Sequence, residues 1–577
     1  MKRIPILVVI LALCGCSPGP NAPSGSAASD VQPAASTSWP HGGMVSAANP
    51  YAVQAAAEVL ARGGHAVDAA IAAHAVLGLV EPESSGLGGS GFMLVYDAGD
   101  AMPVVFDGRE TAPAGAAPDM FMRDGQPMGF REAWQTGLAV GVPGAVAMYE
   151  AAHREYGRLP WAELFAPAIR LAENGFEITP KLHDWLVRLA PMVSTANSPD
   201  AYAYFYPDGE PLAAGAMQRN PPYARMLERI AADGAAALYQ GEVAAAIAAR
   251  VRREPMPGSM TAADINDYTV VKRAAVCGGF RGGRICSAPP PSSGLAQIMI
   301  ANLYDLLDPD DASRPQDIRA FVDAQRLAYA DRDRYVADPA YADVPTEALI
   351  APAYLAARAA DRFDPDEKAT PGEPRAGARG AAAAGASAEQ PGTSHLSIID
   401  TDGNAVSMTA SVGAPFGSLR MTHGFLLNNE MSDFAMAPTE MGVPVVNAVA
   451  PGKRPRSSMS PTMVFDAAGE LSMVTGSPGG NSIVAYVAKS IVAALDWGFS
   501  AQQAADFPNI IARGDTVRVE NTDATGQAIA DALAAEGYDV KESAGENSGL
   551  HLIVVHPDRL DGAADKRREG TVAHVGP

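Results

Sequence analysis

The stretch Thr393–Ser411, TSHLSIIDTDGNAVSMTAS, carries the clearest structural signal in the chain. Residues 394–400 follow a strand pattern, residues 401–404 form a turn signal, and a second strand pattern covers residues 405–411. Two such runs on either side of an Asp-Gly turn are typical of a β-hairpin. Thr393 therefore stands at the open end of a predicted hairpin.

The segment immediately before this hairpin, residues 364–392, has a different composition. It consists of Pro, Gly, Ala and isolated charges without apolar periodicity, which predicts a disordered segment. If the chain is cut before Thr393, the freed α-amine can act as general base for the threonine's own hydroxyl. Thr393 is then a candidate nucleophile, although a lone threonine after a loop is more often structural.

A second candidate feature is a strand at residues 471–475 that runs into Ser477-Pro478-Gly479-Gly480 and a helical pattern from Asn481. Glycines at such a turn expose backbone N–H groups at the positive end of the helix, where they can stabilise an oxyanion. A simple tight turn would use the same residues, so the pair alone leaves both interpretations open. The chain has no G-x-S-x-G motif, which argues against an α/β-hydrolase serine.

A glycine-rich loop, Gly86–Gly91, matches the G-x-G-x-x-G pattern of dinucleotide sites. That function requires a strand before the loop and a helix after it. Here two predicted helices within residues 50–80 precede the loop, and a strand at residues 92–96 follows it. We therefore expect close packing of backbone segments at this loop instead of a dinucleotide.

The composition sets outer limits on function. The 577 residues include 43 Lys and Arg against 65 Asp and Glu, a net charge of −22, and 48% are hydrophobic. Nucleic acid is excluded as a partner, because its binding draws on clustered basic residues. The length suits two to four domains or one large layered body.

The N-terminus resembles a bacterial lipoprotein signal. Lys2 and Arg3 precede an apolar run that ends at Leu13-Cys14-Gly15-Cys16. This predicts a signal peptide over residues 1–15, a lipid on Cys16 and a flexible tether over residues 16–40. A signal peptide cleaved at a nearby site is the alternative. The expected location is the periplasm, with the lipid in the outer membrane.

Two further cysteines, Cys277 and Cys286, flank the glycine-containing insert GGFRGGRI. The insert favours a hairpin turn that places the two thiols on paired strands, and an oxidising compartment favours a disulfide. Two buried free thiols are the alternative. Two cysteines alone make a poor metal site.

Eight blocks of the sequence, in order, resemble the gamma-glutamyltransferase family of N-terminal nucleophile hydrolases. They are Gly63–Ala70 (GGHAVDAA), Gly86–Met93 (GLGGSGFM), Asp107–Pro113 (DGRETAP), Pro289–Gly294 (PPPSSG), Thr393–His395 (TSH), Leu426–Asn429 (LLNN), Arg454–Thr462 (RPRSSMSPT) and Thr475–Gly480 (TGSPGG). The resemblance implies an α+β fold, an αββα four-layer sandwich. It also implies a precursor that cuts itself between Gly392 and Thr393 into a large subunit, residues 41–392, and a small subunit, residues 393–577.

The same resemblance assigns chemical roles. Thr393 is the expected nucleophile, Ser411 replaces a threonine that helps to activate it, and Gly479 and Gly480 donate to the oxyanion. The expected substrate-binding residues hold an α-carboxylate or an α-ammonium. They are Arg109, Ser457 and Ser458 for the carboxylate and Asp433 for the ammonium, with Glu430 standing where many members have Gln.

Three departures from the family pattern affect substrate binding. Gly413 stands where some members have an asparagine that contacts the substrate. The segment of residues 433–457 is short and lacks the tyrosine that forms a lid over the pocket in some members. Glu430 adds negative charge beside the expected ammonium site.

The resemblance implies transfer of the γ-glutamyl group of glutathione or related compounds to water, amino acids or peptides, with no cofactor and no metal. One alternative is an acylase for cephalosporin or glutaryl side chains, which Asp433 argues against, since glutaryl lacks an ammonium. Another is an uncut, inactive periplasmic lipoprotein that binds amino acids or peptides.

Overall fold

The computed structural model describes residues 39–194, 198–307, 318–361, 364–377, 383–384 and 389–576. The predicted signal peptide, Cys16 and nearly all of the predicted tether lie outside these residues. Among the described helices, none is both long enough and apolar enough to span a bilayer.

Two antiparallel sheets form the centre of residues 39–576. The seven-stranded sheet runs in the order β24 (Thr571–Val575), β1 (Gly43–Ala47), β11 (Gly392–Ile399), β12 (Ala405–Gly413), β2 (Ser90–Tyr96), β3 (Val104–Asp107) and β8 (Val271–Ala274). The six-stranded sheet runs in the order β23 (Leu560–Ala564), β22 (His551–Val555), β18 (Leu471–Thr475), β17 (Thr462–Phe465), β10 (Gly283–Ser287) and β9 (Val276–Phe280). The predicted hairpin is β11 and β12, at the middle of the first sheet.

The alternation of side chains along β2 shows how the layers stack. Phe92 and Leu94 point into a core shared with the second sheet, whereas Met93 and Val95 point into a core shared with helices. The rings of Tyr96 and Phe465 meet between the sheets with centroids 5.0 Å apart. Because successive strand residues face opposite sides, one strand serves both cores.

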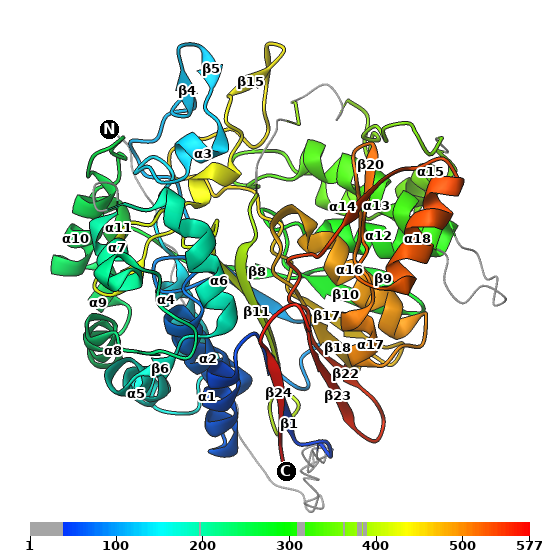
Figure 1. Cartoon of the computed structure of the whole chain (residues 1–577). Helices are drawn as coiled ribbons and strands as arrows, with labels where there is room; N and C mark the ends of the chain where they lie inside the picture. The colour runs from blue at the N-terminus through cyan, green and yellow to red at the C-terminus, as the bar shows by residue number, and fades with distance from the viewer. Residues whose placement is uncertain are drawn as a thin grey trace, which may run out of the picture. The chain divides into compact units, whose positions relative to one another are not determined.

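Helices cover the outer face of each sheet (Figure 1). Those on the first sheet include α1 (Pro50–Ala61), α2 (Ala66–Val80) and α4 (Ala145–Tyr156), while α5 (Ala166–Asn174) packs on α2 and α8 (Pro221–Asp233) packs on α5. Those on the second include α12 (Gly294–Leu307), α16 (Ile483–Leu495) and α17 (Ala501–Asp506), while α13 (Ile318–Tyr335) packs on α12. The order helix, sheet, sheet, helix is the αββα sandwich of the prediction, which is confirmed.

Other elements lie outside the four layers. They include α6 (Pro180–Leu189), α7 (Pro199–Phe205), α10 (Gly241–Val251), α15 (Pro352–Ala360), α18 (Ala524–Ala535) and a three-stranded sheet of β19 (Ile510–Arg513), β20 (Thr516–Glu520) and β21 (Asp539–Ser543).

The GGHAVDAA block sets the start of α2. Gly63, with φ +80°, ends the preceding helix, and His65 and Asp68 form a capping box at the start of α2. Buried Asp68 also accepts the backbone N–H groups of Arg158 and Leu159, at 2.9 and 3.0 Å. This carboxylate thus joins α2 to the chain that follows α4, and α2 packs on β11 and β12.

Cys277 and Cys286 form a disulfide between β9 and β10, where they are directly opposite each other in the register. The turn between these strands contains Arg281 and Gly282, both with positive φ. The glycine-containing insert thus makes the hairpin that its composition indicates.

Residues 364–392 contain few regular elements, but the described ones make defined contacts. Gly372 donates its N–H to Asp331 at 2.7 Å, Ala383 bridges to Val445, and Glu389 is buried. The composition predicted disorder because it lacks an apolar pattern. Polar contacts to distant parts of the chain, which have no sequence periodicity, hold these residues instead.

The GLGGSG loop packs backbone against backbone, as predicted. A Cβ on Gly89 would lie 2.1 Å from the carbonyl oxygen of Ser411, and one on Gly88 would lie 2.1 Å from that of Leu426. Real Cβ atoms do not approach a carbonyl oxygen so closely, so only glycine fits. The loop thereby brings β2 against β12 at the level of Ser411.

We predict that Gly89→Ala forces β2 away from β12 and lowers the free energy of unfolding by about 2 kcal/mol or more, because backbone atoms have no room to yield. Gly129→Ala is the matched control, since a Cβ there meets nothing within 4 Å and its φ is −68°. Thermal unfolding followed by circular dichroism measures both. Equal midpoints for the two variants would contradict the packing argument.

Candidate active site

Thr393 lies at the start of β11, in a strand that still contains Gly392. Its hydroxyl donates to the Ser411 hydroxyl at 3.3 Å, and Ser411 in turn donates to the carbonyl oxygen of Gly392 at 2.8 Å. The N–H of Gly413 donates to Ser411 Oγ at 2.8 Å. Ser411 is thus fixed on the carbonyl of the peptide that joins residues 392 and 393.

The peptide at Gly392 is tightly enclosed by β12. A Cβ on Gly392 would lie 2.4 Å from the carbonyl oxygen of Gly413 and 2.5 Å from the carbonyl carbon of Ala414. The register between β11 and β12 also shifts at residues 392 and 393. A bulge of this kind re-aims the local backbone and is common next to active sites.

Gly413, the first departure from the family pattern, has φ +96°. A side chain there would lie 2.1 Å from Asn429 Oδ1, which accepts the N–H of Ala414 at 2.8 Å. The amide of Asn429 therefore fills the space that an asparagine at position 413 would need. The sequence shows the glycine at position 413, but it does not show that Asn429 fills the space beside it, since the two residues lie on different elements.

The glycine turn after β18 lies against the chain just before Gly392. Gly479 and Gly480 have φ of +135° and +56°, and α16 starts three residues later. A Cβ on Gly480 would lie 2.7 to 2.9 Å from the backbone of Glu389 and Gln390. The turn therefore lies beside the chain that leads to Thr393, at the N-terminal end of a helix.

One cavity brings together eight of the nine residues expected to act on the substrate. It is lined by Arg109, Thr393, Ser411, Glu430, Asp433, Ser457, Ser458 and Gly480, together with Glu389, Gln390, Gly413, Met459 and Ile483. Gly479 lines an adjoining cavity. The volume is only ≈ 10 Å³. Residues 389 and 390, which precede the predicted cut site, help to line it.

Arg109 is fully buried and contacts three carboxylates. Its guanidinium lies 2.5 Å from Asp433 and 3.2 Å from Glu110, and it also pairs with Glu430. Burial, and then the charge of Glu430, raises the pKa of both Glu110 and Asp433 well above the ordinary value. In the continuous chain, therefore, Arg109 is paired with protein carboxylates. Glu430, in place of Gln, supplies one of the charges.

The two serines are held by neighbouring blocks. Ser293 donates to the carbonyl oxygen of Ser457 at 2.6 Å, and Ser292 donates to that of Met459 at 2.7 Å. Ser458 Oγ accepts a hydrogen bond from Arg332 at 2.7 Å. The PPPSSG block thus supports the backbone of the RPRSSMSPT block, which brings Ser457 and Ser458 to the cavity.

Three charged residues that the sequence did not single out are Glu389, which lines this cavity, and two arginines that contact it from behind. Glu389 lies in the segment of low complexity, Arg332 lies on α13, and Arg456 lies in the RPRSS block itself. The only sequence signal was an arginine directly before two candidate serines. The other two have no local pattern, because they reach the site through tertiary packing.

The segment between Asp433 and Ser457, for which the sequence predicts no aromatic lid, forms a short hairpin of β15 (Thr439–Glu440) and β16 (Val443–Pro444). Met441, at its tip, is 97% exposed. In Figure 1 the hairpin projects from the end of the molecule where β4 (Met122–Arg123) and β5 (Gln126–Pro127) also lie.

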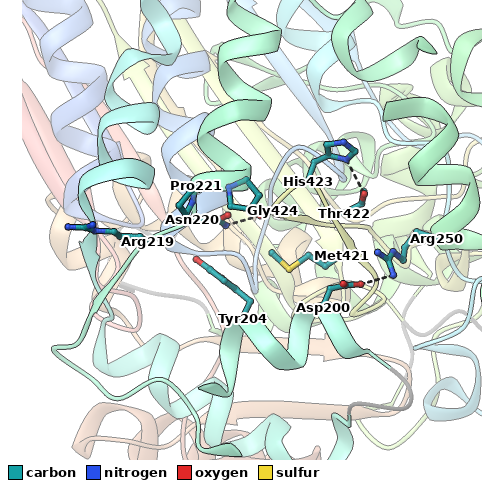
Figure 2. A pocket seen from close by; sticks show the side chains of 11 residues that line it. Asp200, Tyr204, Arg219, Asn220, Pro221, Arg250, Met421, Thr422, His423 and Gly424 are labelled. Atoms are coloured by element: carbon teal, nitrogen blue, oxygen red, sulfur yellow. Dashed lines mark hydrogen bonds and ion pairs between the residues drawn. The ribbon is translucent and has the colours of Figure 1, made fainter. Parts of the chain in front are cut away.

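A different cavity, of ≈ 340 Å³, contains none of the predicted site residues (Figure 2). Its polar groups pair with one another. Arg250 lies 2.6 Å from Asp200, and Asn220 donates to the carbonyl of Gly424 at 2.9 Å. Within the described ranges there is also no group of three or more His, Cys, Asp or Glu side chains able to hold a metal ion.

Comparison with known proteins finds relatives over almost the whole chain. The family model described as gamma-glutamyltranspeptidase matches residues 52–575. A glutathione hydrolase proenzyme of Escherichia coli is 35% identical over 91% of this chain and 90% of its own length. An acylase proenzyme of a Pseudomonas species is 33% identical over 92% and 93%.

A solved structure, of a cephalosporin acylase from Bacillus halodurans, covers 92% of this chain and 96% of its own, with a TM-score of 0.80 and 25% identity. The match to the family model spans almost all of the described residues and includes every residue at the cavity. The chain therefore belongs to the gamma-glutamyltranspeptidase family.

Proposed function

We propose that the chain cuts itself between Gly392 and Thr393 and that the new N-terminal Thr393 transfers γ-glutamyl groups from glutathione or related donors. The observation that carries this proposal is the Ser411 hydroxyl, which donates to the Gly392 carbonyl and accepts from the Thr393 hydroxyl. It polarises the bond to be cut and holds the nucleophile beside it.

In the first reaction, Thr393 Oγ attacks the carbonyl carbon of Gly392. The bond from that carbon to the Thr393 nitrogen breaks, the nitrogen takes up the hydroxyl proton, and an ester remains between Gly392 and Thr393. Water then hydrolyses the ester, which gives a carboxylate on Gly392 and a free α-amine on Thr393. The same oxygen is thereby released for substrate.

In the second reaction, the α-amine accepts the proton of Thr393 Oγ as this oxygen attacks the γ-carbonyl of the donor. The amine of the donor leaves with that proton, and an acyl-enzyme remains on Thr393. Water or the amino group of an acceptor then takes the acyl group. We assign the oxyanion of each tetrahedral intermediate to the N–H groups of Gly479 and Gly480.

A histidine base is not needed for this chemistry. No histidine lines the cavity, and His395, two residues from Thr393, bonds to Thr409 at 2.8 Å and Ser397 at 3.1 Å. Burial lowers the pKa of His395 well below its ordinary value. Its ring thus serves the packing between the sheets.

The charges at the cavity suit a γ-glutamyl group. Glu430 and Asp433 place two carboxylates where an α-ammonium would bind, and Glu430 Oε1 is buried without a hydrogen bond from any described donor. Ser457 and Ser458 provide hydroxyl groups for the α-carboxylate. Arg109 uses its N–H groups on Glu110, Glu430, Asp433 and two backbone carbonyls in the uncut chain, so we propose that it exchanges one of these partners for the α-carboxylate when substrate binds. Water, amino acids and peptides are the proposed acceptors.

An acylase for cephalosporin or glutaryl side chains is the second candidate, since a relative named as an acylase matches with 33% identity and a solved cephalosporin acylase with 25%. A glutaryl group has no ammonium. The unpaired oxygen of Glu430 beside Asp433 therefore favours the γ-glutamyl donor, because a buried carboxylate oxygen needs a partner.

We also propose that the protein is exported as a lipoprotein. Cys16 would carry the lipid, and the protein would lie at the outer membrane. The sequence of residues 1–16 supports this part of the proposal.

The cut at Gly392 and Thr393 depends on one hydroxyl. Thr393→Ala is expected to remain a single chain on a denaturing gel and to release no aniline from a γ-glutamyl anilide, because it lacks the attacking oxygen. Thr393→Ser keeps that oxygen and is expected to mature and to turn over substrate. A Thr393→Ala protein that separates into two chains would disprove the assignment.

Donor choice tests the ammonium site. For a mature Asp433→Asn enzyme, we expect kcat/KM for a γ-glutamyl anilide to fall by about 100-fold, because the substitution removes one partner of a buried charge pair. The value for the matching glutaryl anilide should change by less than about 3-fold, because this donor lacks the ammonium. Equal losses for both donors would place the ammonium elsewhere.

A further inference from the structure

Two arginines directly behind the cavity wall, in contact with the lining residue Glu389, have no role in the reactions above. Arg332 lies on α13 and Arg456 lies immediately before Ser457, and neither side chain is exposed. A guanidinium group that is taken fully out of water is costly unless it is paired with an anion. Their partners therefore show what the site is built to hold.

The anion between these two arginines is Glu389. Arg332 lies 2.6 Å from the Glu389 carboxylate and donates to Ser458 Oγ at 2.7 Å, and Arg456 Nε lies 3.6 Å from the same carboxylate. Arg332, Arg456 and Ser458 hold the pKa of Glu389 below its ordinary value even though burial opposes this. Two arginines and a serine thus surround one carboxylate.

The charge balance around Glu389 is positive. Arg332, Arg456 and Arg513 carry three positive charges, while Asp333 and Glu389 carry two negative charges. Asp333 is shared by all three arginines, at 2.8, 3.9 and 2.8 Å. Without Glu389 the group would hold three cations and one anion, with two of the cations fully buried. The site therefore requires a second anion.

Glu389 belongs to the segment that the proposed cut sets free. It precedes the cut site by three residues and lines the same cavity as Thr393 and Ser458. After the cut, covalent attachment to β11 no longer fixes it there. In its place, a carboxylate on the substrate would meet the same charges.

We propose that Arg332, Arg456 and Ser458 form a carboxylate-binding subsite that Glu389 fills in the uncut chain and a carboxylate of the substrate fills in the mature enzyme. This inference rests on the proposed function. The carboxylate comes either from the γ-glutamyl group itself, as its α-carboxylate, or from the amine that leaves. Glu389 thereby keeps the site closed until the cut.

The first test needs no activity. In a Thr393→Ala background, which stays uncut, Glu389→Ala removes the internal carboxylate and leaves a space the size of formate. Formate is expected to raise the thermal midpoint of the double variant by about 1 °C or more at ten times its dissociation constant. The Thr393→Ala parent should not respond, because Glu389 already fills the site.

Formamide, of the same size but uncharged, is the matched probe, with ionic strength kept constant by sodium gluconate. A larger midpoint shift with formate than with formamide, seen only in the double variant, supports the subsite. Equal shifts with the two probes, or the same formate shift in the parent, would overturn it.

The second test measures kcat and KM of mature Arg456→Met and Arg456→Lys enzymes. The three donors are γ-glutamyl-4-nitroanilide, its α-methyl ester, and γ-glutamyl-3-carboxy-4-nitroanilide. Arg456→Met removes the charge and keeps much of the volume, and Arg456→Lys restores the charge. We expect Arg456→Met to lower kcat/KM about 10-fold or more for a donor whose carboxylate uses the subsite, mainly through KM. Arg456→Lys should recover part of this loss.

The pattern across donors identifies the source of the carboxylate. If it is the α-carboxylate, both nitroanilides lose kcat/KM and the methyl ester does not. If it belongs to the leaving amine, only the carboxylated nitroanilide loses it. Equal losses for all three donors, or none, would overturn the proposal. If the wild-type enzyme turns over no donor, the proposed function has failed, and the formate test still decides the subsite.

Discussion

The pairing of β11 with β12 is the constraint on which the rest of the site depends. It places Thr393 opposite Ser411 and fixes the Ser411 hydroxyl between the N–H of Gly413 and the carbonyl of Gly392. The backbone of residue 89 also lies against the backbone of Ser411, so closely that only glycine fits at position 89. The sandwich thus acts as a rigid frame that holds one peptide bond against one hydroxyl.

Charge is arranged in two groups around that peptide. On one side, Arg109 is outnumbered by Glu110, Glu430 and Asp433, which leaves an excess of carboxylates. On the other side, Arg332 and Arg456 share one buried carboxylate from the chain's own segment. A substrate that carries both an ammonium and a carboxylate would match the two groups.

Much of the fold and of the candidate site could be predicted from the sequence. The β11 and β12 hairpin, the two helices before the glycine loop and the strand, turn and helix at Gly479 and Gly480 follow from local patterns, and the structure contains them. The family resemblance also identified eight residues that line one cavity, five of them within the motif blocks. Local patterns succeed here because strand alternation and glycine turns are properties of adjacent residues.

The remainder depends on tertiary contacts that leave no local pattern. Glu389 stands in a segment whose composition predicts disorder, yet it is buried between two arginines. Asn429 fills the space beside Gly413, and Arg109 is paired with Glu430 and Asp433. Each of these contacts joins residues far apart in the chain or on different elements, so composition and periodicity could not reveal them.

The central claim is that the peptide bond held by Ser411 is the one that breaks. Intact mass spectrometry with N-terminal sequencing of the purified wild-type protein tests it most directly. The account predicts two chains, with the smaller one starting at Thr393. A fully active preparation that contains only the uncut chain, or a small chain with any other first residue, would contradict it.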